Sequence, residues 1–278
     1  MLISTYSFAG TNTDNPIKVI IPYPPGGGVD TVFRIFQKYA DMKSITFIPE
    51  YKNGAQGQIG ISYFSNIPQT SNTILLAPIS DVIKFNLTHP RNNLVQVSSL
   101  STNQFVIVTG KNPKPLTATE ATNKLINATS WGYSSSVLNE ITDNILEKQI
   151  ISRVNPVNVP FNGAASLLQS LMGNHIDLAV LPASVAIPAV ESGALTLVAT
   201  INYKSKMSPI SVNADIPLDG YGIFLPPLST KKEVDSLNCI IANIVSDTEY
   251  RMAIQEKYMQ VHPYGVEFVN SIIRAHDN

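Results

Sequence analysis

The chain has 278 residues, enough for one large domain or two of moderate size. Apolar residues make up 44% of it, so a full core can be buried, whereas charged residues make up only 14%, against about 25% in typical soluble domains. A formal net charge of −1 without a basic stripe argues against nucleic acid as a partner. No run approaches the roughly 18 apolar residues of a membrane span, and the single cysteine excludes an internal disulfide.

The first clear element is a buried strand that ends in a proline- and glycine-rich loop. Residues 16–36 read PIKVIIPYPPGGGVDTVFRIF, in which Ile17–Ile21 is near-continuously apolar and predicts a buried strand. From Asp30 the apolar residues recur at helical spacing, and Asp30 itself suits an N-cap or first-turn acid. A strand that stops at three glycines before a helix predicts a place where backbone comes close to another group.

Strands and helices then alternate, which predicts βαβ units and mostly parallel sheets. Loops after parallel strands meet at one sheet edge, so we expect the loops 22–30, 50–57 and 78–81 to lie together. Thr117 with Glu120 predicts a capping box. The expected strands are 17–21, 45–49, 73–77, 105–109, 131–133, 154–159, 176–181, 195–201 and 222–225, and the later helices include 137–150, 230–246, 248–258 and 266–275.

This order predicts two α/β lobes with a cleft between them. We expect residues 1–104 and 226–278 to form the first lobe and 105–225 the second, with hinge crossovers near 100–110 and 218–226.

No catalytic motif is present. The sequence lacks a phosphate-binding G-x-x-x-x-G-K-[ST] loop, G-x-S-x-G, H-E-x-x-H and paired cysteines, so we expect no cofactor, no metal and no enzyme. The enzyme alternative is an α/β hydrolase or transferase for an acyl or phosphoryl substrate, and its best nucleophile is Ser80 beside Asp81 with a distant histidine. The four histidines are scattered, at positions 89, 175, 262 and 276.

Two glycine-rich loops offer backbone N–H groups instead. Pro24–Gly28 and Gly54–Gly57 each expose several N–H groups near a helix start, where the helix dipole favours an anion such as a carboxylate. The alternative interpretation is that both loops are only tight turns. Glu50, at a strand end beside the second loop, is either a ligand contact or a structural carboxylate.

Six segments, in order over nearly the whole chain, are IKVIIPYPPGGGVDTVFRIFQK (17–38), KNGAQGQIGISYFS (52–65), TILLAPIS (73–80), VNVPFNGAASLLQSLMGNHIDLAV (157–180), SGALTLVAT (192–200) and GIFLPPLSTKKEV (222–234). They resemble the periplasmic solute receptors of tripartite tricarboxylate transporters, the TctC or Bug family. The first two segments are the most specific.

The resemblance implies a Venus-flytrap fold whose two lobes close on a small carboxylate, with backbone amides of the first lobe and hydroxyls and amides of the second as ligand contacts. The residues it points to are Tyr23, Pro24, Pro25, Gly26, Gly27, Gly28, Asp30, Gly54, Ala55, Gln56, Gly57, Ser80, Ser134, Ser135, Ser136, Phe161, Asn162, Gly163 and Ser184. The loop GYSSSVLN (132–139) lacks two glycines of the family pattern, so ligand specificity does not carry over.

By this resemblance the chain is a monomeric periplasmic receptor of a Gram-negative bacterium that delivers its ligand to membrane transporter subunits. A ligand sensor that docks on a membrane signalling protein fits equally well. Residues 1–9 are either the remnant of a clipped signal peptide or an unstructured leader.

Overall fold

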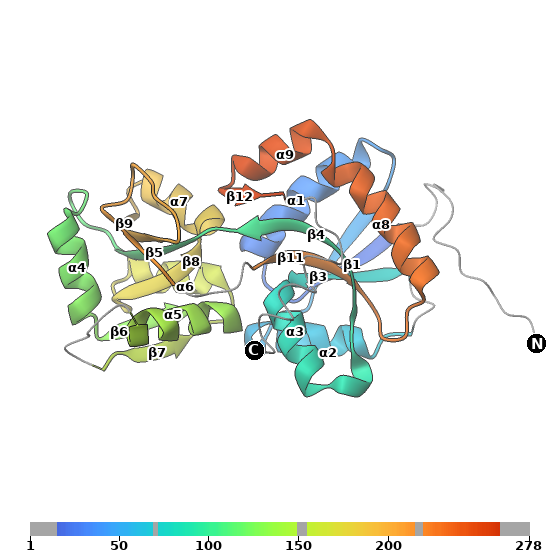
Figure 1. Ribbon diagram of the computed structural model, residues 1–278, viewed down its shortest axis with the longest axis horizontal. Coiled ribbons are helices and arrows are strands. Elements are labelled where there is room, and N and C mark those ends of the chain that lie inside the picture. The colour runs from blue at the N-terminus through green and yellow to red at the C-terminus, as the bar shows by residue number, and fades with distance from the viewer. Residues whose placement is uncertain (1–15, 69–71, 149–154, 215–218, 262–278) are drawn as a thin grey trace, which may run out of the picture.

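The computed structural model describes residues 16–68, 72–148, 155–214 and 219–261. The predicted helix at 266–275, the histidines at 262 and 276 and the N-terminal residues 1–9 lie outside these ranges. Figure 1 shows two α/β lobes side by side, as the sequence predicts. Among the described residues, no helix is long and apolar enough to cross a bilayer.

The first lobe is built on a six-stranded sheet in the order β12-β4-β11-β3-β1-β2. Its strands are β1 (Ile17–Ile21), β2 (Phe47–Tyr51), β3 (Thr73–Pro78), β4 (Val95–Asn103), β11 (Gly220–Leu225) and β12 (Met259–Gln260). Its helices are α1 (Gly28–Asp41), α2 (Gln58–Ser65), α3 (Ile79–Thr88), α8 (Lys231–Val245) and α9 (Thr248–Gln255), with single 3₁₀ turns at Ala55–Gly57 and Pro90–Asn92.

The second lobe is built on a six-stranded sheet in the order β10-β9-β5-β8-β6-β7. Its strands are β5 (Phe105–Gly110), β6 (Ser130–Tyr133), β7 (Val157–Pro160), β8 (Leu178–Pro182), β9 (Leu195–Ile201) and β10 (Ile210–Val212). Its helices are α4 (Ala118–Asn127), α5 (Ser136–Lys148), α6 (Ala164–Met172) and α7 (Ala183–Glu191).

Both sheets are mixed, so the prediction of mostly parallel sheets needs correction for the first lobe. Strand β1 is parallel to β2 and β3, but β11 is antiparallel to β3 and β4, and β12 is antiparallel to β4. In the second lobe β5 is antiparallel to both β8 and β9. The antiparallel pairs arise at the strands that join the lobes, which a βαβ pattern does not predict.

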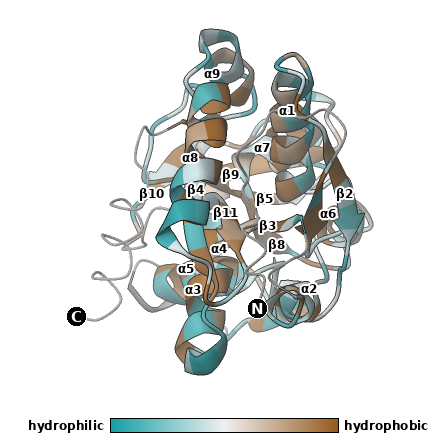
Figure 2. Ribbon diagram, turned by 90° about the vertical axis from the view of Figure 1, so that its right-hand side faces the viewer, coloured by the Kyte–Doolittle hydropathy of each residue, from teal (hydrophilic) through white to brown (hydrophobic). Residues whose placement is uncertain are grey.

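Each sheet is covered by helices on both faces, because successive strand residues point to opposite sides. In β1, Val19 and Ile21 join a core under α1, α8 and α9, whereas Ile20 packs under α2 and α3. The second sheet is likewise divided between a core under α4 and α5 and one under α6 and α7. Figure 2 shows the hydrophobic strands between helices whose faces are partly hydrophilic.

The lobes are joined by strands that cross between them. Strand β4 runs into β5 through Gln104 alone, as the long strand in the middle of Figure 1 shows. The return crossing lies between β10 and β11. The sequence-based boundary at residue 225 places Gly220–Leu225 in the second lobe. In the structure this segment is β11, which pairs with β3 and β4 and so belongs to the sheet of the first lobe.

Candidate ligand-binding cleft

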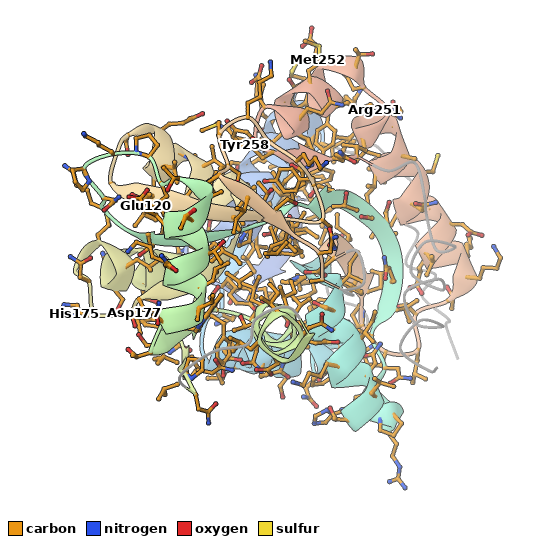
Figure 3. The ribbon with its side chains drawn as sticks, turned by 60° about the vertical axis from the view of Figure 1, so that its left-hand side comes forward. Glu120, His175, Asp177, Arg251, Met252 and Tyr258 are labelled. Carbon is orange, nitrogen blue, oxygen red and sulfur yellow. The ribbon has the colours of Figure 1, made fainter. Side chains whose placement is uncertain are left out.

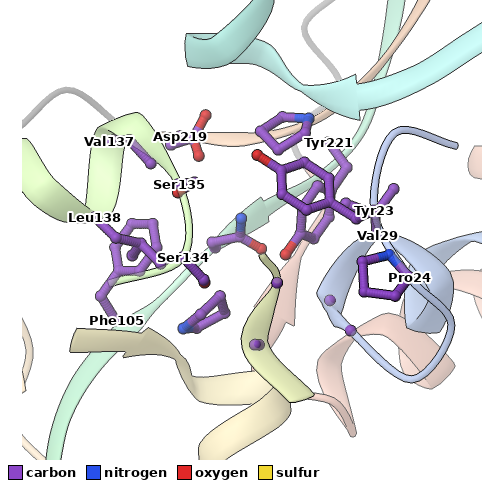
Figure 4. Close-up of a pocket in the computed structure, with 17 residues that line it drawn as sticks. Tyr23, Pro24, Val29, Phe105, Ser134, Ser135, Val137, Leu138, Asp219 and Tyr221 are labelled. Atoms are coloured by element: carbon purple, nitrogen blue, oxygen red, sulfur yellow. The ribbon is translucent and has the colours of Figure 1, made fainter. Parts of the chain in front are cut away.

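A cavity of about 40 Å³ lies between the lobes beside the crossing strands (Figure 4). One water needs roughly 10–15 Å³ on the same scale, so this conformation accommodates only a small molecule. The first lobe contributes Tyr23, Pro24, Gly27, Gly28, Val29, Pro78, Asn103, Asp219 and Tyr221; the second contributes Phe105, Ser134, Ser135, Val137, Leu138, Gly163, Ala164 and Pro182.

Several helices begin at this cavity. The N-cap residues of α1, α3, α6 and α7 are Gly27, Pro78, Gly163 and Pro182, and all four line it. Helix α5 begins directly after Ser134 and Ser135, which also line it. None of these four N-cap residues caps its helix through a side-chain hydrogen bond.

Helices α4, α8 and α9 begin elsewhere and are capped by side chains, whereas α2, whose N-cap Gly57 also lies outside the lining, has no side-chain cap. Thr117 and Glu120 form the predicted capping box of α4, Thr230 and Glu233 form one on α8, and Asp247 accepts two backbone N–H groups at the start of α9. None of these residues lines the cavity, and Figure 3 shows Glu120 on the outside of the second lobe. The contrast leaves backbone donors and the positive ends of helix dipoles concentrated at the cleft, where they favour an anion.

The structure brings seven of the sequence-predicted residues together in the lining: Tyr23, Pro24, Gly27, Gly28, Ser134, Ser135 and Gly163. They come from the β1–α1 loop, the start of α5 and the start of α6. The two lobes touch here, because a Cβ atom on Gly163 would lie 2.9 Å from Pro24. The glycine at this position allows the loops to approach each other.

Asp30, Pro25 and Gly26 lie outside the lining. The Asp30 carboxylate accepts hydrogen bonds from the Gly26 N–H at 2.9 Å, the Tyr51 hydroxyl at 2.6 Å and the Arg34 Nε at 3.2 Å. In this structure Asp30 therefore holds the glycine loop against α1 and β2.

The second glycine loop, Gly54, Ala55, Gln56 and Gly57, also lies outside the lining. The Gln56 carbonyl accepts from the Tyr23 hydroxyl at 2.9 Å, and the Gln56 N–H donates to Asn162 Oδ1 of the other lobe at 3.5 Å. The loop and Asn162 thus connect the lobes outside the cavity lining, whereas Phe161 packs against the core of the second lobe. Glu50 pairs with Lys18 and Lys52, which gives it a structural role.

The remaining predicted residues belong to helix starts. The expected loop at 78–81 is the beginning of α3, and Ser80 lines a separate hollow of about 300 Å³ between α3 and α5. Ser136 is the first residue of α5, and Ser184 is buried in α7 outside the cavity lining.

Sequence reasoning missed three polar residues of the lining, Asn103, Asp219 and Tyr221. All three are buried and lie where the chain crosses between the lobes. Asp219 Oδ1 accepts the Ser80 N–H at 3.2 Å. Burial and then the nearby Asp81 charge raise the pKa of Asp219 to about 7. In the sequence, Asp219 could have been recognised as an acidic residue directly before the apolar strand Gly220–Leu225. The described residues hold no group of three or more His, Cys, Asp or Glu side chains placed to bind a metal.

Gly28 provides a direct test of packing at this site. A Cβ atom there would collide with the Tyr221 hydroxyl and lie 3.0 Å from Tyr221 Cζ. Since Tyr221 is buried, we expect Gly28→Ala to lower the free energy of unfolding by about 1–3 kcal/mol. In Gly27→Ala the new Cβ would meet only the Pro24 carbonyl, at 3.6 Å, so its effect should be smaller. Equal urea midpoints for the two variants would contradict the Gly28–Tyr221 packing.

Two α/β lobes joined by crossing strands around a central cavity define the fold of the periplasmic binding proteins. BugD, a periplasmic binding protein, is similar, with 17% identity, a TM-score of 0.79 and 94% of each chain covered. MatC from Rhodopseudomonas palustris with bound malate matches at 17% identity and a TM-score of 0.74 over 94% of this chain and 95% of its own.

A histidine kinase sensor domain similar to periplasmic binding proteins matches more distantly, at 13% identity and a TM-score of 0.53 over 88% of this chain and 96% of its own. No known family model and no curated protein matches the chain. These similarities confirm the two-lobed fold that the sequence resemblance implies.

Proposed function

We propose that the protein is an extracytoplasmic receptor that captures a small carboxylate-bearing solute between its lobes. The observation that carries the proposal is the convergence of helix N-termini without side-chain caps on one interlobe cavity. A carboxylate there would accept backbone N–H groups and lie at the positive ends of several dipoles. The malate bound to MatC is a ligand of this class, on a similar fold.

In this proposal the receptor works by closing its two lobes on the ligand. Interlobe contacts, including the Gln56–Asn162 hydrogen bond and one of 2.8 Å from the Tyr258 hydroxyl to Glu191, hold the present conformation. Figure 3 shows Tyr258 on the side of the first lobe that faces the second. A ligand that contacts both lobes binds the closed form more tightly and therefore shifts the population toward it.

The enzyme alternative receives no support from the geometry. The His89 ring contacts the Thr88 hydroxyl and the Phe85 carbonyl, and Figure 3 places His175 at the outer edge of the second lobe. Among the described residues, the Ser80 hydroxyl has no hydrogen bond to a histidine, so neither of these two histidines is placed as the base that a serine nucleophile requires. The similar structures named above are likewise binding or sensor proteins.

The receptor would work as a monomer that passes its ligand to membrane transporter subunits outside the cytoplasm. The similarity to a histidine kinase sensor domain favours one second candidate, a ligand sensor that signals through a membrane partner. Both candidates use the same ligand-driven closure, so the cleft argument applies to either.

A thermal-shift screen of small carboxylates on refolded, ligand-free protein tests the proposal. A ligand at about 100 times its Kd adds about 2.7 kcal/mol, which raises the midpoint by several degrees. We expect a shift with at least one acid and recovery of that acid unchanged by mass spectrometry. Turnover of the acid would show an enzyme, and no shift across amino-, hydroxy-, di- and aromatic acids would overturn the carboxylate receptor.

A further inference from the structure

The wall of the cavity on the first lobe carries two buried hydrogen-bond acceptors. Asp219 is 3% exposed and Asn103 is 7% exposed, and both line the cavity. Asn103 Oδ1 has no hydrogen-bond partner among the described residues. Leaving such a buried acceptor unpaired is unfavourable, so a group that brings an N–H or O–H to it is favoured.

The charge around these acceptors is negative. Asp81 lies fully buried near Asp219 and raises its pKa by like-charge repulsion. The Tyr23 hydroxyl donates to Asp81 at 2.5 Å and to the Gln56 carbonyl at 2.9 Å, so its single proton is already shared between them. No lysine, arginine or histidine is among the described residues that line the cavity.

The same cavity therefore combines two opposite requirements. The helix starts of both lobes favour an anion, whereas Asp219 and Asn103 favour a donor-bearing cation. Building on the proposed function, we propose that the ligand is a small aminocarboxylate, whose carboxylate faces the helix N-termini and whose ammonium contacts Asp219 and Asn103.

An ammonium group fits this wall because it has three donors and no acceptor. A carboxylate offers about four acceptor positions. Asp219 accepts the Ser80 N–H and also interacts with the Gly220 N–H and the Ser80 hydroxyl, which leaves room for one ligand N–H, and Asn103 Oδ1 accepts a second. A dicarboxylate in the same cavity would set a second negative charge beside Asp219 and leave Asn103 Oδ1 unpaired. The wall thus selects against dicarboxylates such as the malate bound to MatC.

Calorimetric titration with matched acids tests this proposal on refolded protein. The probes are amino acids of two to six carbons, each compared with the unaminated monocarboxylate and the dicarboxylate of the same carbon number. For the carbon skeleton that binds, we expect the amino acid to bind at least tenfold more tightly than either counterpart.

The Asp219→Asn variant separates a ligand contact from a purely structural role, because the amide oxygen can still accept the Ser80 N–H. We expect it to lower the affinity for the amino acid at least tenfold while the unaminated acids lose nothing. Asp235→Asn on exposed α8 is the matched control and should change neither. Binding of an unaminated acid as tightly as its amino counterpart would overturn this proposal alone, whereas no binding by any carboxylate would overturn the proposed function as well.

Discussion

At pH 8, Asp219→Asn is expected to raise the unfolding temperature of the ligand-free protein by on the order of 10 °C. The reason is the cost of ionising a carboxyl group that is buried near Asp81, which raises the pKa of Asp219 from an ordinary 3.8 to about 7. Each tenfold change in proton affinity is worth about 1.4 kcal/mol, so this difference amounts to about 4 kcal/mol. The amide has no charge to bury and keeps an acceptor for the Ser80 N–H.

The sign of the pH dependence follows from the raised pKa. The folded state holds the Asp219 proton more tightly than the unfolded state, so its contribution to stability is complete below about pH 3.8 and is lost as the pH rises to about 7. The stability difference between the variant and the wild type should therefore grow by about 4 kcal/mol between pH 4 and pH 8. Urea unfolding of both proteins at several pH values measures that difference, in which the carboxyl groups that do not interact with Asp219 cancel. A difference that does not change with pH would show that Asp219 titrates normally.

Local patterns in the sequence were sufficient for the elements that surround the cleft. The apolar run Ile17–Ile21 is β1, and the helical stripe that follows it is α1, with Asp30 in its first turn. The Thr117–Glu120 spacing forms the predicted capping box. These features depend on neighbours a few residues apart, which periodicity and capping rules describe well.

The strands that join the lobes were harder to predict. Residues 95–103, VQVSSLSTN, form β4, which lies between β12 and β11 in the sheet, although serine and threonine weaken the apolar pattern of a buried strand. Their backbone groups are paired by β11, a segment more than a hundred residues later in the chain. Pairing at this sequence separation leaves no local signal, so β4 and the membership of β11 in the first sheet emerge only from the fold.

The polar lining of the cavity shows the same limit. Ser134 and Ser135 were predicted from the family resemblance, and their loop does follow a strand and precede a helix. Asn103 and Asp219 reach the cavity only because β4 and β11 lie side by side, with the Asn103 N–H donating to the Asp219 carbonyl at 2.8 Å. A glycine loop can be recognised from sequence, but an acceptor pair assembled from two distant segments requires the topology.

Gly27→Val is expected to weaken ligand binding at least about 100-fold, or about 2.7 kcal/mol, while the ligand-free protein remains folded. Gly27 has φ −86° and ψ 179°, an extended conformation that valine readily adopts, and a Cβ atom there would meet only the Pro24 carbonyl at 3.6 Å. Because Gly27 lines the cavity at the start of α1, the added methyl groups would occupy space beside the free N–H groups of the helix.

The decisive comparison is between binding and stability across a small series. Gly27→Ala should lose part of the affinity and Gly27→Val nearly all of it, with little change in the unfolding temperature of either ligand-free protein. Gly193→Ala is the opposite control. Gly193 has a φ of +72°, at which a side chain is strained, and it lies outside the cavity lining. This variant should therefore lose stability while its affinity for the ligand stays unchanged. Full affinity in Gly27→Val would mean that the glycine loop is only a turn and that the carboxylate binds elsewhere, since backbone approach at α1 would then be unnecessary.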